Sequence, residues 1–102
     1  LSSIVSSSLN TKTAAELMSV NEDDSVESFS KEDTDRIFFI LQMQRAMFEN
    51  LYDQNKRGLL TEGYYEGAPT KNLKTIAGAF LAFKIAMSTE FEAEVRRVLA
   101  LP

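Results

Sequence analysis

The sequence contains no histidine, no cysteine and no tryptophan, and it has only four glycines and two prolines in 102 residues. Without cysteine the chain can form no disulfide, no thiolate nucleophile and no cysteine-ligated zinc site. Without histidine it also lacks the general base of Ser-His-Asp and Cys-His sites and the usual pH switch. These absences remove the commonest catalytic arrangements, so we expect a chain without catalytic residues, metal site or cofactor.

Long hydrophobic runs and clustered positive charge are also missing. The apolar run Ile37 to Leu41 is only five residues long, whereas a membrane-spanning helix needs roughly 20. The net charge is −4 and the 11 basic residues are scattered, whereas phosphate binding needs a basic face. We therefore expect no membrane span in this chain and no nucleic-acid binding, and instead a protein partner or self-association.

The first residue is Leu1 rather than Met. We expect that a segment once preceded it, such as a signal peptide or a membrane anchor. A cytoplasmic location is favoured, with membrane association through that preceding segment as the alternative.

The length fits one domain with one hydrophobic core. Residues 1–12 are rich in serine and indicate a linker or a short helix, and residues 13–102 indicate a single helical domain. A short helix should begin at Thr13, and an acidic loop should follow from Asn21 to Phe29. No segment shows the alternation of apolar and polar residues that is typical of strands.

A long helix from Ser30 to Arg57 is the strongest prediction. Ser30 and Asp33 resemble a capping box at its start, and Gly58 is placed to end it, with Lys56 and Arg57 suited to the negative end of the helix dipole. The helix would contain about 27 residues and measure about 40 Å. One face should be a solvent-exposed polar stripe made of Gln42, Arg45, Glu49, Asp53 and Lys56.

The apolar arc of this helix is wider than one neighbouring helix can cover. Its flank at Phe39, Met43 and Met47 allows two interpretations. Methionine and aromatic side chains suit an adaptable partner surface, and the same residues could be core covered by the N-terminal helix. We favour core and keep the partner interface as the alternative.

Three further helical segments are expected after Gly58. Thr61 should start a short one that carries Tyr64 and Tyr65, Thr70 should start an amphipathic helix through Met87, and Thr89 with Glu92 resembles the capping box of a final helix. Gly78 predicts either a break or a close helix contact. The fold class is thus all-α, a small orthogonal or antiparallel bundle of four to five helices around one long central helix.

Two acidic segments resemble calcium-binding loops. The segment from Asp53 to Thr61 has the ligands and the glycine of an EF-hand start, but Arg57 takes the fifth position and Tyr64 the twelfth, where carboxylates are needed. The second begins at Asn21 and has Val26 where a glycine is needed. We interpret both as ordinary turns or loops, and a degenerate EF-hand-like metal-binding domain stays an alternative.

A carboxylate-based hydrolase is the least favoured alternative. Glu49 and Asp53 are four residues apart on the predicted polar stripe, whereas general acid–base work requires carboxyl groups in a cleft. We interpret the pair as part of a solvated stripe beside Arg45 and Lys56.

The stretch ENLYDQNKRGLLTEGYYEG, residues 49–67, resembles a widespread set of uncharacterised bacterial proteins. In that set a long helix ends in a similar stretch, passes through Gly-Leu-Leu, and precedes a segment similar to Ser88 to Phe91. The resemblance implies a helical domain, often with an N-terminal membrane helix, and implies no active site. The sequence departs from the pattern by lacking tryptophan. Our hypothesis is a non-catalytic helical interaction or regulatory domain.

Overall fold

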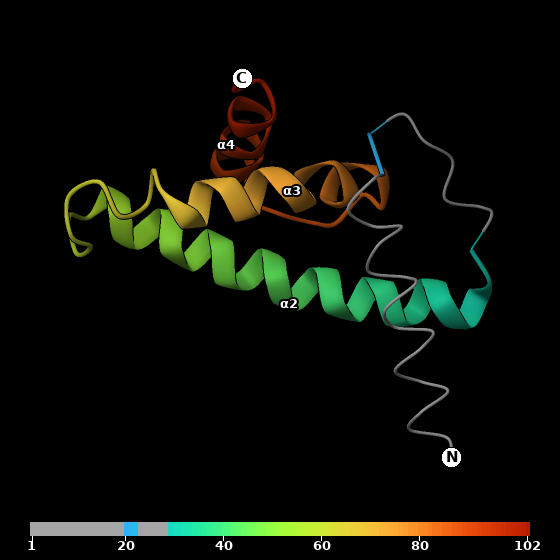
Figure 1. The fold of residues 1–102 in the computed structure, drawn as a ribbon. Helices are drawn as coiled ribbons and strands as arrows, with labels where there is room; N and C mark the ends of the chain where they lie inside the picture. The colour runs from blue at the N-terminus through green and yellow to red at the C-terminus, as the bar shows by residue number, and fades with distance from the viewer. Residues whose placement is uncertain (1–19, 23–28) are drawn as a thin grey trace, which may run out of the picture.

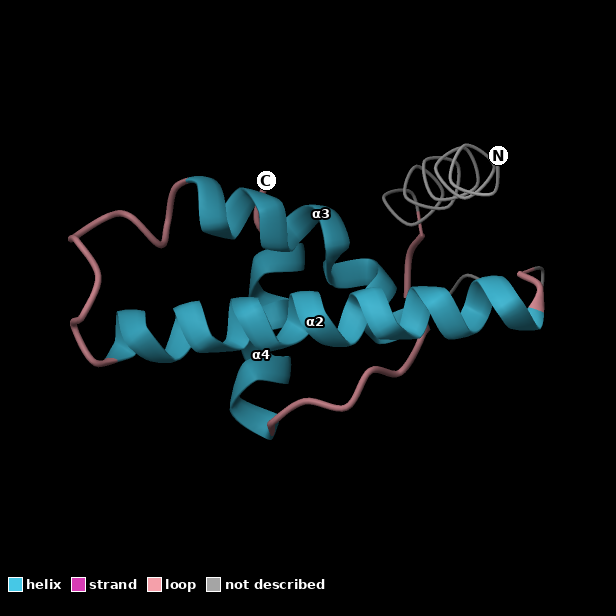
Figure 2. Cartoon of the chain, turned by 90° about the horizontal axis from the view of Figure 1, so that it is seen from below, coloured by secondary structure: helices cyan, strands magenta, loops and turns pink. Residues whose placement is uncertain are grey.

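A computed structural model describes residues 20–22 and 29–102 of the chain. This part contains three helices, α2 (Lys31–Lys56), α3 (Ala68–Ala82) and α4 (Thr89–Leu99), and no strand. α3 runs beside α2 in the opposite direction, and α4 crosses them steeply (Figures 1 and 2). The all-α prediction is confirmed. The expected linker or short helix at 1–12, the helix from Thr13 and most of the acidic loop lie outside the described residues.

Helix α2 begins and ends where local signals in the sequence predict. The backbone N–H of Asp33 donates a 3.1 Å hydrogen bond to Oγ of Ser30, which caps the first turn. At the other end Gly58 has a φ of 72°, and its N–H donates to the carbonyl of Asn55 at 3.1 Å while Leu59 N–H donates to Gln54 at 2.9 Å. This pair of hydrogen bonds is the Schellman motif, which favours glycine because of the positive φ.

The segment between α2 and α3 is a series of turns, so the short helix predicted from Thr61 is wrong. Tyr64 N–H donates to the Thr61 carbonyl and Gly67 N–H donates to the Tyr64 carbonyl, each across three residues. α3 then begins at Ala68 and not at Thr70, with Pro69 in its first turn. Proline is tolerated there because first-turn N–H groups have no partner inside the helix.

Helix α3 is shorter than predicted, because it ends at Ala82 although apolar residues continue at helical spacing to Met87. Lys84 adopts a positive φ of 54°. Its N–H donates to the Leu81 carbonyl at 3.1 Å, and Ile85 N–H donates to the Phe80 carbonyl at 2.9 Å. The helix therefore ends in a second Schellman motif, with lysine where glycine is usual.

Helix α4 starts one residue earlier than its predicted capping box. The cap is Ser88, whose Oγ accepts a 3.1 Å hydrogen bond from Phe91 N–H, and Thr89 is the first helical residue. Phe91, Val95 and Val98, which recur at helical spacing, form its inward face and are all fully buried.

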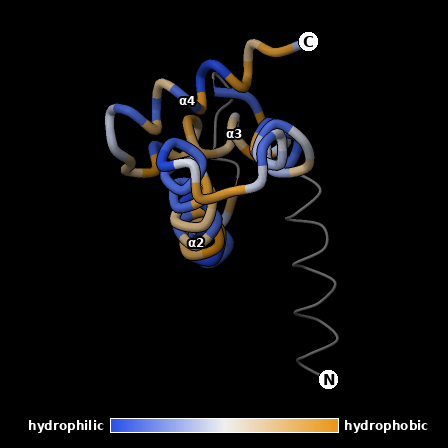
Figure 3. Tube along the Cα trace, turned by 90° about the vertical axis from the view of Figure 1, so that its left-hand side faces the viewer, coloured by the Kyte–Doolittle hydropathy of each residue, from blue (hydrophilic) through white to orange (hydrophobic). Residues whose placement is uncertain are grey.

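The core lies mainly between α3, α4 and one side of α2. The buried cluster comprises Ile37, Leu41, Phe48, Leu73, Ala77, Ala79, Phe80, Phe83, Ile85, Phe91, Val95 and Val98. Viewed nearly along α2, the other two helices lie on one side of it (Figure 3). Among the described helices α2 is thus the longest but not the central one, and one of its sides is left uncovered.

Gly78 lies in the middle of an unbroken α3 and against the segment that precedes α2. A Cβ atom at this position would lie 2.5 Å from the backbone oxygen of Val20. The predicted close contact is therefore present, but its partner is a backbone segment at Val20 and not a helix.

Candidate functional site

The outward side of α2 carries three large exposed hydrophobic side chains. Phe39 is 65% exposed, Met43 is 58% exposed and Met47 is 47% exposed. They follow one another at intervals of four residues, so they form one stripe on the helix surface. We call this stripe, with the exposed Ala46 beside it, the outward face of α2. In the described part of the chain these residues are not core, and the N-terminal helix that was expected to cover them lies outside the described residues.

The stripe is exposed because of the rotation of α2 about its own axis. Its buried residues Ile37, Leu41 and Phe48 lie on the far side from Met43, and the predicted polar stripe turns toward the start of α4. The helix is therefore rotated by roughly a quarter of a turn from the orientation that hydrophobicity alone predicts. Hydrogen-bonded and ion-paired polar groups make this orientation possible, because a paired polar side chain can be half-buried at low cost.

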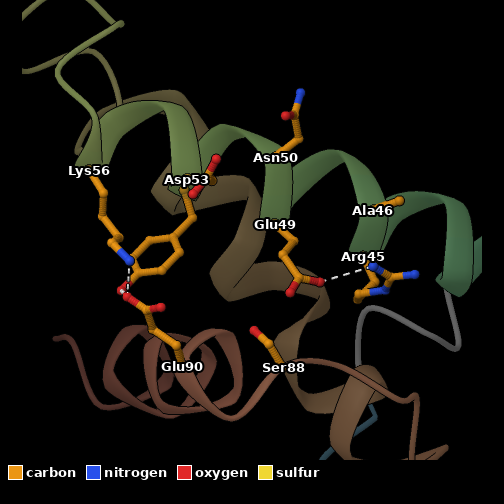
Figure 4. Close-up of a pocket in the computed structure, with 9 residues that line it drawn as sticks. Arg45, Ala46, Glu49, Asn50, Asp53, Lys56, Ser88 and Glu90 are labelled. Atoms are coloured by element: carbon orange, nitrogen blue, oxygen red, sulfur yellow. Dashed lines mark hydrogen bonds and ion pairs between the residues drawn. The ribbon is translucent and has the colours of Figure 1, made fainter.

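These polar groups line a groove of about 320 Å³ between α2 and the N-terminus of α4 (Figure 4). Glu49 accepts a 2.9 Å hydrogen bond from Arg45, four residues before it on α2. Lys56, the last residue of α2, forms an ion pair with Glu90 in the first turn of α4. Lys56 thus holds the end of α2 against the start of α4, and Ser88, the N-cap of α4, hydrogen-bonds to Glu49.

The electrostatics of the groove favour an ionised Glu49. Burial raises the pKa of Glu49, but hydrogen bonds from the side chain and backbone of Ser88, together with the Arg45 guanidinium, outweigh it and hold the pKa below its ordinary value. A carboxyl group that acts as a general acid needs a raised pKa. The geometry at Glu49 thus gives no support to the hydrolase alternative.

The first residues of the EF-hand-like segment belong to helix α2 and not to a loop. Asp53 and Asn55 lie in the last turns of α2, and Asp53 forms a 3.1 Å ion pair with Arg57. Among the described residues no group of three or more His, Cys, Asp or Glu side chains is arranged to hold a metal ion. In the second candidate segment, residues 23–28 lie outside the described part, and Glu22 accepts two hydrogen bonds from Arg96.

A buried polar cluster connects the turn before α3 with α4. The hydroxyl of Tyr65 donates a 2.8 Å hydrogen bond to Oε2 of Glu94, and Arg97 donates to both carboxylate oxygens of Glu94 at 2.7 and 2.8 Å. Glu94 is only 7% exposed. This cluster was not predicted from the sequence, although Glu94 stands among buried apolar positions of α4 and Arg97 follows three residues later.

The pKa shifts in this cluster favour a neutral Tyr65 and an ionised Glu94, the states that form the hydrogen bond between them. Burial raises the pKa of Tyr65, and its hydrogen bond to Glu94 raises it further. Burial also raises the pKa of Glu94, but Arg97 and Tyr65 outweigh burial and lower it. Tyr65 is therefore neutral and Glu94 ionised near neutral pH, and we assign the cluster a role in holding the turn to α4.

Comparison of the chain with protein-family models, curated proteins and solved structures finds no match. The resemblance to uncharacterised bacterial proteins therefore stays a prediction. No helix in the described part of the chain is both long and apolar enough to cross a membrane.

Proposed function

We propose that this chain is a non-catalytic helical interaction domain that binds a protein partner through the outward face of α2. In this proposal the three described helices belong to the bundle of four or five helices that the sequence predicts. The observation that carries the proposal is the stripe of Phe39, Met43 and Met47, whose side chains are 65%, 58% and 47% exposed.

The chemistry of this stripe suits a protein surface. Exposed large hydrophobic side chains are common as single residues, but a contiguous group of them marks an interaction site more often than chance. Aromatic residues and methionine are enriched at the centre of protein interfaces, and the unbranched methionine side chain adapts its shape to a partner. Charged side chains lie toward both ends of α2, which gives the apolar centre a polar surround.

Oxidation of methionine provides a direct test. Met43 and Met47 should be oxidised readily by dilute hydrogen peroxide in the purified chain at about 1 µM, because their thioethers are accessible. In an extract of the source cells, where the partner is present, both should be protected. Mass spectrometry quantifies each sulfoxide, and the half-buried Met87 serves as an internal control that should not change. Equal oxidation of Met43 and Met47 in both samples would contradict the proposal.

A further inference from the structure

The outward face of α2 carries charges in an alternating order on either side of its apolar centre. Glu32 and Arg36 lie before the apolar stripe and form a 3.3 Å ion pair. Asp53, which lies at the border between this face and the groove toward α4, and Arg57 lie after the stripe and form a 3.1 Å ion pair. At about 100° per residue all four share an arc of about 120° with Phe39 and Met43. Asp35, whose side chain is 70% exposed, lies at the same angle as Asp53. From the N-terminus, the face therefore shows two negative residues and a positive one, then the apolar stripe, then a negative and a positive residue.

This order is complementary to itself in one orientation only. When a second α2 lies antiparallel in the register centred between residues 44 and 45, Glu32 of each copy lies opposite Arg57 of the other, and Arg36 lies opposite Asp53. The Glu32 side chain is 84% exposed and the Arg57 side chain 69% exposed, so both are accessible to a second copy. In a parallel arrangement each of these residues would lie opposite the same residue of the other copy, so like charges would face each other, which is unfavourable.

The same register brings the apolar centres together. Met43 of one copy lies opposite Ala46 of the other, so a large side chain meets a small one. On either side of this contact Phe39 lies opposite the exposed Asn50, and Met47 opposite the exposed Gln42. Antiparallel packing also places the positive end of one helix dipole beside the negative end of the other. Apolar contact, charge order and dipole direction thus agree on one arrangement.

Building on the proposed function, we infer that the partner is a second copy of this chain, bound antiparallel along the outward face of α2 in a two-fold symmetric dimer. Such an interface uses the same surface on both copies. The 26 residues of α2 span about 39 Å, and a face about 10 Å wide gives on the order of 400 Å² for each copy, about half of a standard interface. The dimer is therefore weak and exchanges readily.

Two charge-reversal variants test the register. The first combines Glu32→Arg with Arg36→Glu, and the second combines Asp53→Arg with Arg57→Glu. Each variant keeps two opposite charges four residues apart within its own helix, so α2 itself should remain intact. Circular dichroism verifies that both variants keep the helix content of the unmodified chain.

Sedimentation equilibrium from about 1 µM to about 1 mM measures the association. The unmodified chain should dimerise, and each variant alone should dimerise at least about tenfold more weakly, because like charges then face each other at both ends of the contact. An equimolar mixture of the two variants should recover the affinity of the unmodified chain, since each altered end meets the complementary end of the other. A parallel dimer would not show this pattern.

Two results would overturn the inference. One is an unmodified chain that stays monomeric at about 1 mM; the other is a mixture that associates no better than the separate variants. If Met43 and Met47 are nevertheless protected in the cell extract, the proposed interaction domain stands and its partner is a different protein. If they are not protected there either, the proposed function fails as well.

Discussion

The hydroxyl of Tyr65 donates a 2.8 Å hydrogen bond to the carboxylate of Glu94, which lies 29 residues further along the chain. This contact holds the turn that follows α2 against α4. Because Arg97 binds both oxygens of the same carboxylate, the ionised Glu94 is fully engaged although it is buried. The cluster thus stabilises the position of α4, which in turn holds the polar side of α2 through Glu90 and Ser88.

Replacing Tyr65 with phenylalanine should lower the free energy of unfolding by about 1–3 kcal/mol, because the buried carboxylate loses one of its donors. The matched control is Tyr64→Phe. Tyr64 is 52% exposed, so the loss of its hydroxyl should change the free energy of unfolding by less than about 0.5 kcal/mol. Urea denaturation followed by circular dichroism compares the two variants. Equal effects would show that the Tyr65–Glu94 contact adds no stability.

The stability contributed by Glu94 should depend on pH. Its pKa in the folded chain lies below the ordinary value of 4.5, so the folded state binds protons less readily than the unfolded state. The contribution is fully present above the unfolded pKa and is lost as the pH falls through the folded pKa. The difference in unfolding free energy between the unmodified chain and Glu94→Gln should therefore be largest near neutral pH and should shrink below about pH 4.5. A difference that stays constant from pH 7 to pH 3 would contradict the assignment.

Replacing Lys84 with glycine should stabilise the chain by about 1 kcal/mol, because Lys84 holds a positive φ of 54° that costs a residue with a Cβ atom roughly 1–2 kcal/mol. Lys84→Ala removes the same side chain but keeps the Cβ atom, so it should give no such gain. Thermal unfolding of both variants separates backbone strain from side-chain effects. Equal stabilisation by alanine and glycine would show that the backbone of Lys84 is not strained.

Replacing Gly78 with alanine should destabilise the chain by about 1–3 kcal/mol, since the new Cβ atom would lie 2.5 Å from the Val20 oxygen. Helix propensity alone predicts the opposite, a gain of about 1 kcal/mol. The sign of the change in unfolding free energy, measured by chemical denaturation, thus shows whether residue 78 lies against Val20. A stabilised variant would show that Val20 does not lie against α3.

Local signals in the sequence were sufficient to predict the ends of α2, because Ser30 and Gly58 act through hydrogen bonds to residues near them in the chain. The end of α3 could not be predicted, since lysine rarely takes the left-handed conformation that Lys84 adopts. The rotation of α2 could not be predicted from the sequence pattern either, because it depends on contacts of Glu49 and Lys56 with α4.

The candidate site was found in the sequence but its environment was not. Phe39, Met43 and Met47 were identified as one flank of α2, and hydrophobicity favoured their burial. Which side of an apolar helix is buried depends on the number of elements that pack on it, and in the described part of the chain α3 and α4 lie on one side only. Glu94 was missed because a single acid on an apolar helix face indicates burial only when its partners are known.

Photo-cross-linking inside the source cells tests the central claim, that the outward face of α2 binds a protein. A benzophenone-bearing residue replaces Met43 in one variant and Asn72, an exposed residue of α3, in a control. After irradiation, gel electrophoresis and mass spectrometry should detect a specific protein adduct from position 43 and none from position 72. If position 43 gives no adduct, or only the adducts that position 72 also gives, the outward face of α2 is not an interaction surface.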